Sequence, residues 1–412
     1  MTRLTVSRSL VAVLAVWAAV SVALALTTVG PTDNWGLFDG GGDLDVYRKG
    51  AWHVMSGVPL YELPVDKKLF YTYTPFSALL FIPLDLLPSV SDRHLFLAAN
   101  LVVLTAVVVQ CWRLVGYRVS VRLVGVSVLL ALGCVFLEPV RTTLFFGQIN
   151  LILMLLVLAD AVGGTRSRVA GVGTGVAAGI KLTPLFFVLY FAVLRQWRVV
   201  AVAVSAFVTT LVIGFVLLPQ DSRTYWGGTF LRSERIGDTL IHPSNQSLRG
   251  AMARISGDYP PTWLWLALAV PIVAASLWTA LRLYRFGDRL LAVTLVGLTS
   301  AVVSPFSWTH HWVWVVPLIV WLVHRALNSW TWWLVPAGLF VAMGAWPHWF
   351  RGLRDPRIGF YLFPDTYVPD VMLRNSYVWL YAILLVACVA YTLRVGRRAN
   401  VVDGQNLSVL SA

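Results

Sequence analysis

Two aspartates, Asp43 and Asp45, stand two residues apart in the segment Gly42-Asp43-Leu44-Asp45-Val46-Tyr47. A carboxylate can take a proton from a sugar hydroxyl, and an Asp-x-Asp pair can hold a divalent metal through a sugar phosphate. An extended backbone would put both side chains on one face, whereas a helix would separate them by about 200 degrees. The structural alternative is a surface helix that uses one aspartate as its N-cap and continues through Ala51 to Met55.

Cationic groups that can bind a phosphate occur at two other places in the chain. Lys181 lies between apolar segments, where an ionisable side chain is costly and usually functional. His310 and His311 follow a helix mouth rich in tryptophan, and an imidazole can bind or protonate a phosphate. The two histidines are alternatively anchors at the membrane surface. We predict that Lys181, His310 and His311 bind the phosphate of a lipid.

Four amide side chains and one phenol have the chemistry to hydrogen-bond sugar hydroxyls. They are Tyr47, Gln148, Asn150, Asn245 and Gln246. Gln148 and Asn150 open an apolar run, and Asn245 and Gln246 lie in the largest polar loop, so capping of helix ends explains the amides equally well. We predict all five as substrate-binding residues.

The composition requires a membrane to surround these residues. The chain has 412 residues, of which 58% are hydrophobic and 12% are charged, whereas a soluble domain is about 25% charged. The formal net charge of +13 does not indicate nucleic-acid binding, because the arginines form small groups beside apolar runs and not one stripe. The three cysteines lie far apart and have no metal-binding spacing.

The arginine groups predict which helix ends face the cytoplasm. The groups are Arg113/Arg118/Arg122, Arg166/Arg168, Arg195/Arg198, Arg282/Arg285/Arg289, His324/Arg325 and Arg394/Arg397/Arg398. Each neighbouring pair must be joined by an even number of crossings. This predicts helices near 122–137, 148–162, 199–218, 261–281, 290–303, 312–325, 330–346 and 375–393. The run near 10–28 is either a first helix, with the N-terminus inside, or a cleaved signal peptide.

Two segments do not fit a regular span. Residues 168–195 are too few for two full crossings, so we expect two short helices that meet at Lys181-Leu182-Thr183-Pro184. Residues 75–87 are short and contain prolines, which indicates a re-entrant or interfacial segment.

The predicted fold is an all-α transmembrane bundle of about twelve crossings with both termini in the cytoplasm. Residues 1–398 form one domain, and 399–412 form a short polar cytoplasmic tail. The polar segments 30–74, 219–260 and 347–374 lie outside, together with residues 138–148 and the turn 304–311. The carboxylate-rich loop 30–74 is the expected catalytic loop.

Taken together, the polar segments resemble a known family. In order, they are Asp43-Leu44-Asp45-Val46-Tyr47, Gly57-Val58-Pro59-Leu60-Tyr61, Phe70-Tyr71-Thr72-Tyr73-Thr74-Pro75, Phe146-Gly147-Gln148-Ile149-Asn150, Lys181-Leu182-Thr183-Pro184, Asn245-Gln246-Ser247-Leu248 and Ser304-Pro305-Phe306-Ser307-Trp308-Thr309-His310-His311. Jointly they resemble the actinobacterial polyprenyl-phosphomannose-dependent α-1,2-mannosyltransferases, glycosyltransferase family 87, of the GT-C fold. One departure is Thr74, where many relatives carry proline, which leaves this turn less rigid.

The resemblance implies an inverting enzyme of the plasma membrane with its active site on the extracytoplasmic side. It would move mannose from a β-linked polyprenyl phosphate to a mannosylated phosphatidylinositol, as the fifth mannose, and its partners would be membrane lipids. It implies Asp43 as the general base, with Asp45 in reserve. We expect no obligatory cofactor, because a single phosphate leaves, although a divalent metal is compatible with the aspartate pair.

Two alternatives to this function stay open at the level of sequence. The first is α-1,2 branching of lipomannan or lipoarabinomannan, which the residues do not separate from the first reading. The second is a carrier or flippase for polyprenyl lipids. Transporters usually show repeated halves and coupling charges at the membrane midplane, whereas this chain shows no repeat and concentrates its carboxylates in one loop.

Overall fold

The computed structural model describes residues 4, 6–27, 29, 36–66, 69–232, 235, 240–348, 357–362 and 370–409. Helices dominate these ranges, and the only strands within them are β1 (Pro347–His348) and β2 (Arg357–Ile358), which pair antiparallel. The all-α prediction is therefore confirmed for the described part of the chain. Parts of the predicted outside loops 30–74, 219–260 and 347–374, and residues 410–412 of the predicted tail, lie outside the described residues.

Five helices in the described ranges are long and apolar enough to cross a membrane. They are α1 (Arg8–Thr27), α5 (Ser89–Val115), α11 (Trp197–Leu217), α14 (Thr262–Arg285) and α19 (Ser376–Val409). A sixth span results if α7 (Glu138–Phe146) and α8 (Asn150–Gly163), which meet at 117°, cross as one broken helix. These helices agree with a protein that passes the membrane several times.

Shorter helices occupy the other predicted spans. They are α6 (Val121–Gly133), α15 (Arg289–Val303), α16 (Val315–Ala326) and α17 (Leu334–Ala342), the last preceded by η6 (Trp330–Trp333). A helix of 13 residues, such as α6, is about 20 Å long, whereas the hydrocarbon core of a membrane is about 30 Å thick. The count of about twelve crossings therefore stays a prediction.

The segment around Lys181 breaks as predicted. Helix α9 (Val172–Ile180) ends before Lys181, and α10 (Phe186–Val193) begins after the short turn η2 (Thr183–Leu185). Two short helices meeting at this lysine are thus confirmed. Residues 75–87 form only the short helices α3 (Pro75–Leu80) and α4 (Ile82–Asp85), which are too short to span a membrane.

Two predicted segments differ in the structure. Residues 138–148 were expected as an outside connection between two helices, but residues 138–146 form the helix α7, whose Glu138 and Arg141 are buried. The tail 399–412 was expected as a separate polar end, but α19 continues to Val409. In both cases a polar side chain or a polar run was taken as the end of a helix, although a helix can continue through it.

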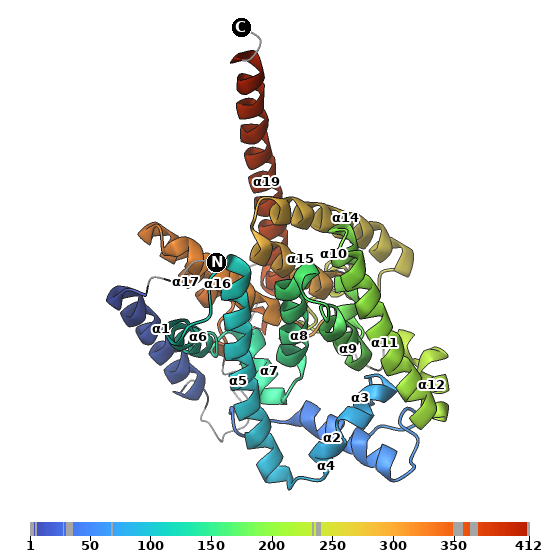
Figure 1. Cartoon of the computed structure of the whole chain (residues 1–412). Coiled ribbons are helices and arrows are strands. Elements are labelled where there is room, and N and C mark those ends of the chain that lie inside the picture. The colour runs from blue at the N-terminus through green and yellow to red at the C-terminus, as the bar shows by residue number, and fades with distance from the viewer. Residues whose placement is uncertain are drawn as a thin grey trace.

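The polar connections contain further short helices. They are α2 (Gly42–Met55), η1 (Gly164–Arg166), α12 (Pro219–Trp226), η3 (Thr229–Leu231), α13 (Leu248–Ser256), η5 (Thr309–Trp314), η7 (Phe360–Leu362) and α18 (Asp370–Leu373). Figure 1 shows α2, α3 and α4 at one end of the bundle, whereas the C-terminal part of α19 projects from the other end.

The arginine-rich segments contact one another across the bundle. Arg198 donates hydrogen bonds to the carbonyls of Thr165 and Ser167, and Arg289 donates to the carbonyl of Ala161. Gln196 donates to the Tyr284 hydroxyl, and the Tyr117 hydroxyl contacts His324. The Asp288 carboxylate accepts from Trp321 and Tyr391. The helix ends that the arginine pattern assigns to one side therefore lie together in space.

The loop helices have a hydrophobic cluster of their own. Tyr47, Tyr71 and Phe81 from the first loop pack with Ile149 of the α7–α8 connection and Ile180 of α9, separately from the main cluster of the bundle. Thr74 caps α3, and its hydroxyl donates to the Gly179 carbonyl. The position where relatives are expected to carry proline is thus tied to α9 by a side-chain hydrogen bond.

Helix α9 lies directly against α11 because it presents glycine there. A side-chain carbon at Gly175 would collide with the backbone of Ala203 and Phe207, and one at Gly179 would collide with Thr210. Small residues allow such close approach of helices inside membranes. This contact sets the position of Lys181, which directly follows α9.

We expect Gly175→Val to force α9 away from α11, because overpacking costs about 1–3 kcal/mol. The midpoint of thermal unfolding in detergent should fall, and it is measured against Gly338→Val as the matched control. Gly338 lies in helix α17 with no atom near enough to collide. Equal midpoints for the two variants would show that the close helix contact does not matter.

Candidate active site

Helix α2 separates the two aspartates of the first loop. The helix begins at Gly42 after Gly41, whose φ of 118° suits glycine, and no side chain caps it. Asp43 accepts a hydrogen bond from Gln148 Nε2 at 2.6 Å, whereas Asp45 pairs with Arg93 at 2.9 Å. The helix through Met55 is therefore present, neither aspartate caps it, and the two carboxylates do not converge on one position.

Asp43 belongs to a hydrogen-bonded group of buried side chains. The other amide atom of Gln148, Oε1, accepts from the hydroxyls of Tyr47 at 3.0 Å and Tyr73 at 3.4 Å. The two hydroxyls lie 3.0 Å apart. Because Gln148 receives both phenols on its oxygen, its NH2 group is directed at Asp43. The structure thus joins three predicted residues, Asp43, Tyr47 and Gln148.

The surroundings of Asp43 suit a proton acceptor. Burial raises the pKa of the Asp43 carboxyl to about 6, and the hydrogen bond from Gln148 and the positive charge of Lys181 oppose this rise. A general base works best when its pKa lies near the working pH. Asp43 is ionised above about pH 6 and is still basic enough to take a proton.

Lys181 lies next to this group and faces the histidines. Its Nζ donates to Asn150 Oδ1 at 3.2 Å, lies 3.0 Å from His311 Nε2, and lies 5.5 Å from the centre of the Tyr73 ring. Tyr73 therefore lies next to the ammonium group and is also hydrogen-bonded to Gln148, the residue that binds Asp43. The hydrogen bond to Asn150 and the neighbouring imidazole fix where the positive charge lies.

The short helix η5 carries both histidines. The His310 carbonyl accepts from Asn150 Nδ2 at 2.9 Å and from Thr143 at 3.3 Å, and the His310 ring packs against Phe146 and His311. The histidines are thus held inside the protein and do not anchor it at a membrane surface. Asn150 is not a capping residue, since its amide links Lys181 to η5.

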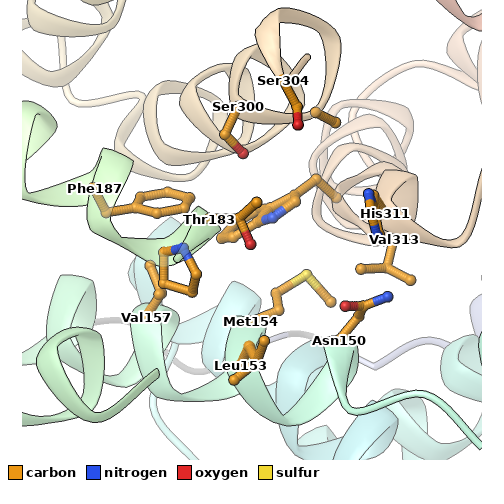
Figure 2. A pocket seen from close by; sticks show the side chains of 13 residues that line it. Asn150, Leu153, Met154, Val157, Thr183, Phe187, Ser300, Ser304, His311 and Val313 are labelled. Carbon is orange, nitrogen blue, oxygen red and sulfur yellow. The ribbon is translucent and has the colours of Figure 1, made fainter. Parts of the chain in front are cut away.

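Accessibility distinguishes the ionisable groups from their supports. Tyr47, Tyr73 and Gln148 are buried, whereas Asp43, Lys181 and His311 keep part of their surface exposed. His311 also lines a cavity of about 40 Å³ together with Asn150 of α8 and Ser300 and Ser304 at the end of α15 (Figure 2). The groups that could react are therefore the ones that a ligand can reach.

Asn245 and Gln246 have structural partners in the same region. Asn245 Oδ1 accepts from the backbone of Ser247 and Ser307, and Gln246 bonds to the backbone of Pro243, Arg374 and Tyr377. Both side chains are fully buried. They hold the segment before η5 against the start of α19, and contact with a substrate stays a prediction for them.

Two residues of this region were not predicted from the sequence. Tyr73 was part of a recognised motif but had no assigned role. Glu138 was given no role, yet it accepts hydrogen bonds from Thr142 and Thr309 at 2.7 Å, Tyr361 at 2.9 Å and Tyr377 at 2.6 Å. Because Thr309 begins η5, this buried carboxylate anchors the helix that carries the histidines.

The described residues of this region do not form a metal site. In the ranges that the structure describes, no group of three or more histidines, cysteines or carboxylates could hold a metal ion. The expectation that no metal or cofactor is obligatory stays a prediction.

Comparisons with known proteins place this geometry in a family. The profile of Glycosyltransferase family 87 matches residues 71–305, more than half of the chain. The chain belongs to this family. The resemblance seen in the sequence motifs is therefore confirmed, and the protein is a glycosyltransferase. The matched part of the chain contains Tyr73, Gln148, Asn150 and Lys181.

Curated relatives are about a third identical to this chain over the residues that align. A polyprenol-phosphate-mannose-dependent alpha-(1-2)-phosphatidylinositol mannoside mannosyltransferase of Mycobacterium tuberculosis is 35% identical, over 68% of this chain and 69% of the relative. A polyprenol-phosphate-mannose-dependent alpha-(1-2)-phosphatidylinositol pentamannoside mannosyltransferase of Mycolicibacterium smegmatis is 36% identical, over 70% of each. No solved structure matches the chain.

We expect Glu138→Ala to destabilise the protein and to lower glycosyl transfer. Four hydroxyl donors would lose their acceptor, and a buried donor without a partner costs about 1–3 kcal/mol. The unfolding midpoint and the rate of transfer are measured against Glu62→Ala, a change at an exposed glutamate. An unchanged midpoint in Glu138→Ala would rule out this anchoring role.

Proposed function

We propose that this protein transfers mannose from polyprenyl phosphate mannose to a hydroxyl of a mannosylated phosphatidylinositol, forming an α-1,2 linkage. The names of its relatives give this donor, acceptor class and linkage. The observation that carries the proposal is the arrangement of the three partly exposed groups, Asp43, Lys181 and His311. A carboxylate that feels the charge of a nearby lysine, with an imidazole beside that lysine, suits a reaction that takes up a proton and releases a phosphate within one site.

The transfer is a single displacement at the anomeric carbon. Asp43 accepts the proton of the acceptor hydroxyl as that oxygen bonds to the anomeric carbon. The bond from this carbon to the phosphate oxygen breaks, and its electron pair leaves with the polyprenyl phosphate. A donor of β configuration therefore gives an α product. A single displacement needs only one general base. Asp43 is assigned this role, because Asp45 is paired with Arg93.

Lys181 and His311 are assigned to the leaving phosphate. Charge develops on the phosphate oxygen as the bond breaks, and fixed positive charge and hydrogen-bond donors stabilise it more strongly in a site with little water. The Asn150 amide holds Lys181 and the His310 carbonyl at once, so both sources of stabilisation are in place before the donor arrives. His310 supports this position from η5.

The membrane arrangement is part of the proposal. We place the active site on the extracytoplasmic side of the plasma membrane and both termini inside, in a GT-C bundle of about twelve crossings. Support comes from the arginine-rich helix ends, which contact one another, and from α2, α3 and α4 at the end of the bundle opposite the projecting part of α19 (Figure 1).

The acceptor is proposed to receive its fifth mannose. One relative is named for phosphatidylinositol mannoside and another for the pentamannoside, which supports an acceptor of this size range. Membranes that contain the protein, labelled polyprenyl phosphate mannose and phosphatidylinositol mannosides of defined length would test the assignment. Linkage analysis of the product separates α-1,2 transfer from other linkages, and transfer only to long lipomannan would replace the proposed acceptor.

We expect Asp43→Asn to lower the rate of transfer by about 100-fold or more, because an amide cannot take the proton. In the wild-type protein, the rate should fall about tenfold per pH unit below a pKa of about 6 and level off above it, since a protonated Asp43 cannot act as a base. The measurement is kcat/KM for the acceptor between pH 4.5 and about 8.

Asp45→Asn provides the comparison for the base. It should keep the acid limb near pH 6, whatever its effect on the rate, because the titrating group is still present. Asp258→Asn, at an exposed aspartate far along the chain, is the control for rate. Loss of the acid limb in Asp45→Asn, with full transfer by Asp43→Asn, would move the base to Asp45.

For Lys181→Ala we expect weaker use of the donor than of the acceptor. The ammonium group is assigned to the donor phosphate. The KM for polyprenyl phosphate mannose should therefore rise about tenfold, and kcat should fall if the charge also stabilises the leaving phosphate. Steady-state kinetics with each substrate varied in turn measure the two effects. A larger effect on the acceptor would contradict the phosphate role.

A further inference from the structure

The side of α2 that faces away from Asp43 borders a second cleft. Its volume is about 540 Å³, and it is lined by Asp45, Arg48, Lys49, Trp52, His53, Val65 and Asp85. Small-molecule sites usually have volumes of roughly 300 to 1,000 Å³. The residues of the proposed reaction that lie on the same helix, Asp43 and Tyr47, do not line it.

The spacing of the residues on α2 explains this separation. Arg48, Lys49 and Trp52 follow Asp45 by three, four and seven positions, so the four residues form one stripe along the helix. Asp43 and Tyr47 are four residues apart and form another stripe, directed at Gln148. One helix therefore carries the proposed base on one side and the cleft on the other.

Ion pairs hold the walls of the cleft in place. Arg48 contacts Asp85 at 3.5 Å and Asp92 at 3.1 Å, Asp45 pairs with Arg93, and Lys49 pairs with Asp66. Side chains fixed before a ligand arrives lose little entropy when it binds.

The exposed groups of the cleft match the chemistry of a sugar. Trp52 is 49% exposed and makes an edge contact with His53, and an exposed indole ring can pack against the C–H face of a pyranose. An ionised carboxylate has about four acceptor positions, and Asp45 and Asp85 each use a minority of theirs on one arginine. The remaining positions can accept hydrogen bonds from sugar hydroxyls.

The charges of the cleft argue against a phosphate as its ligand. Both cations on its walls, Arg48 and Lys49, are already paired with carboxylates. A phosphate would also meet the carboxylates of Asp45 and Asp85 at close range, and like charges repel at such distances. A neutral ligand rich in hydroxyl groups has neither difficulty.

We propose that this cleft binds sugar units of the acceptor headgroup that lie away from the hydroxyl receiving mannose. The inference rests on the proposed function. An α-helix with its side chains is about 10 Å across, so a ligand with one hydroxyl at Asp43 reaches the cleft only if its headgroup contains several sugars. Trp52 supplies the stacking surface, and Asp45 and Asp85 accept hydroxyl protons.

The test compares two acceptors with the full-length protein in lipid nanodiscs. One is a phosphatidylinositol mannoside with four mannoses, and the other is an alkyl mannoside with one. For Trp52→Ala we expect a rise of about tenfold in the KM for the long acceptor. The KM for the donor, kcat, and all constants for the single-mannose acceptor should stay within about twofold of wild type.

Two further variants make the result specific. Trp52→Phe retains a flat ring and should recover most of the affinity for the long acceptor. The control Trp263→Ala removes another exposed tryptophan, at the start of α14, and should leave all of these constants unchanged. A similar loss for both acceptors, or for the donor, would overturn the proposal and indicate that Trp52 anchors the protein in the membrane.

Direct binding separates this inference from the proposed function. In the Asp43→Asn background, which cannot turn over, binding of the long acceptor is measured by thermophoresis with and without Trp52→Ala. A tenfold weaker Kd in the double variant supports the cleft even if the wild-type protein transfers no mannose. An unchanged Kd overturns the cleft even if the wild-type protein is an active mannosyltransferase.

Discussion

The connection between α7 and α8 fixes the spacing of the reacting groups. Gln148 and Asn150 stand on either side of Ile149 in this bend, and Gln148 holds Asp43 while Asn150 holds Lys181 and the backbone of η5. The bend requires Gly147, whose φ is 68° and whose position leaves no room for a side chain beside Leu44. Two amides on one rigid turn therefore set the position of the carboxylate relative to the cation.

Electrostatics then makes this spacing useful. Burial raises the pKa of the Asp43 carboxyl, and the Gln148 amide and the Lys181 charge oppose this rise. The same ammonium group is available to a phosphate, so arrival of the donor would neutralise it and make Asp43 a stronger base. Charge compensation in a region with little water is large enough for such coupling. Binding of the donor would thus prepare the base for the acceptor.

The sequence predicts the supports of this site better than its contacts. Hydropathy and the arginine groups located α11 and α14, and the short spacing around Lys181 located the break between α9 and α10, because these features depend on local composition. The partner of Asp43 lies 105 residues away, and no local pattern specifies such a pair. Glu138 received no role for the same reason, since three of its four donors come from other segments of the chain.

Helix α2 links chemistry to recognition, because it is a single rigid element with different residues on its two sides. If the distal sugars of an acceptor occupy the cleft beside Trp52, the accepting hydroxyl is positioned at Asp43 by the same helix. Binding of the distant sugars then holds the acceptor with its hydroxyl at Asp43, which lowers the KM for a long acceptor and so raises its kcat/KM. A short acceptor has no distal sugars to bind in the cleft. The enzyme would therefore prefer long mannosides even if no residue contacts the glycosidic linkage of the last sugar.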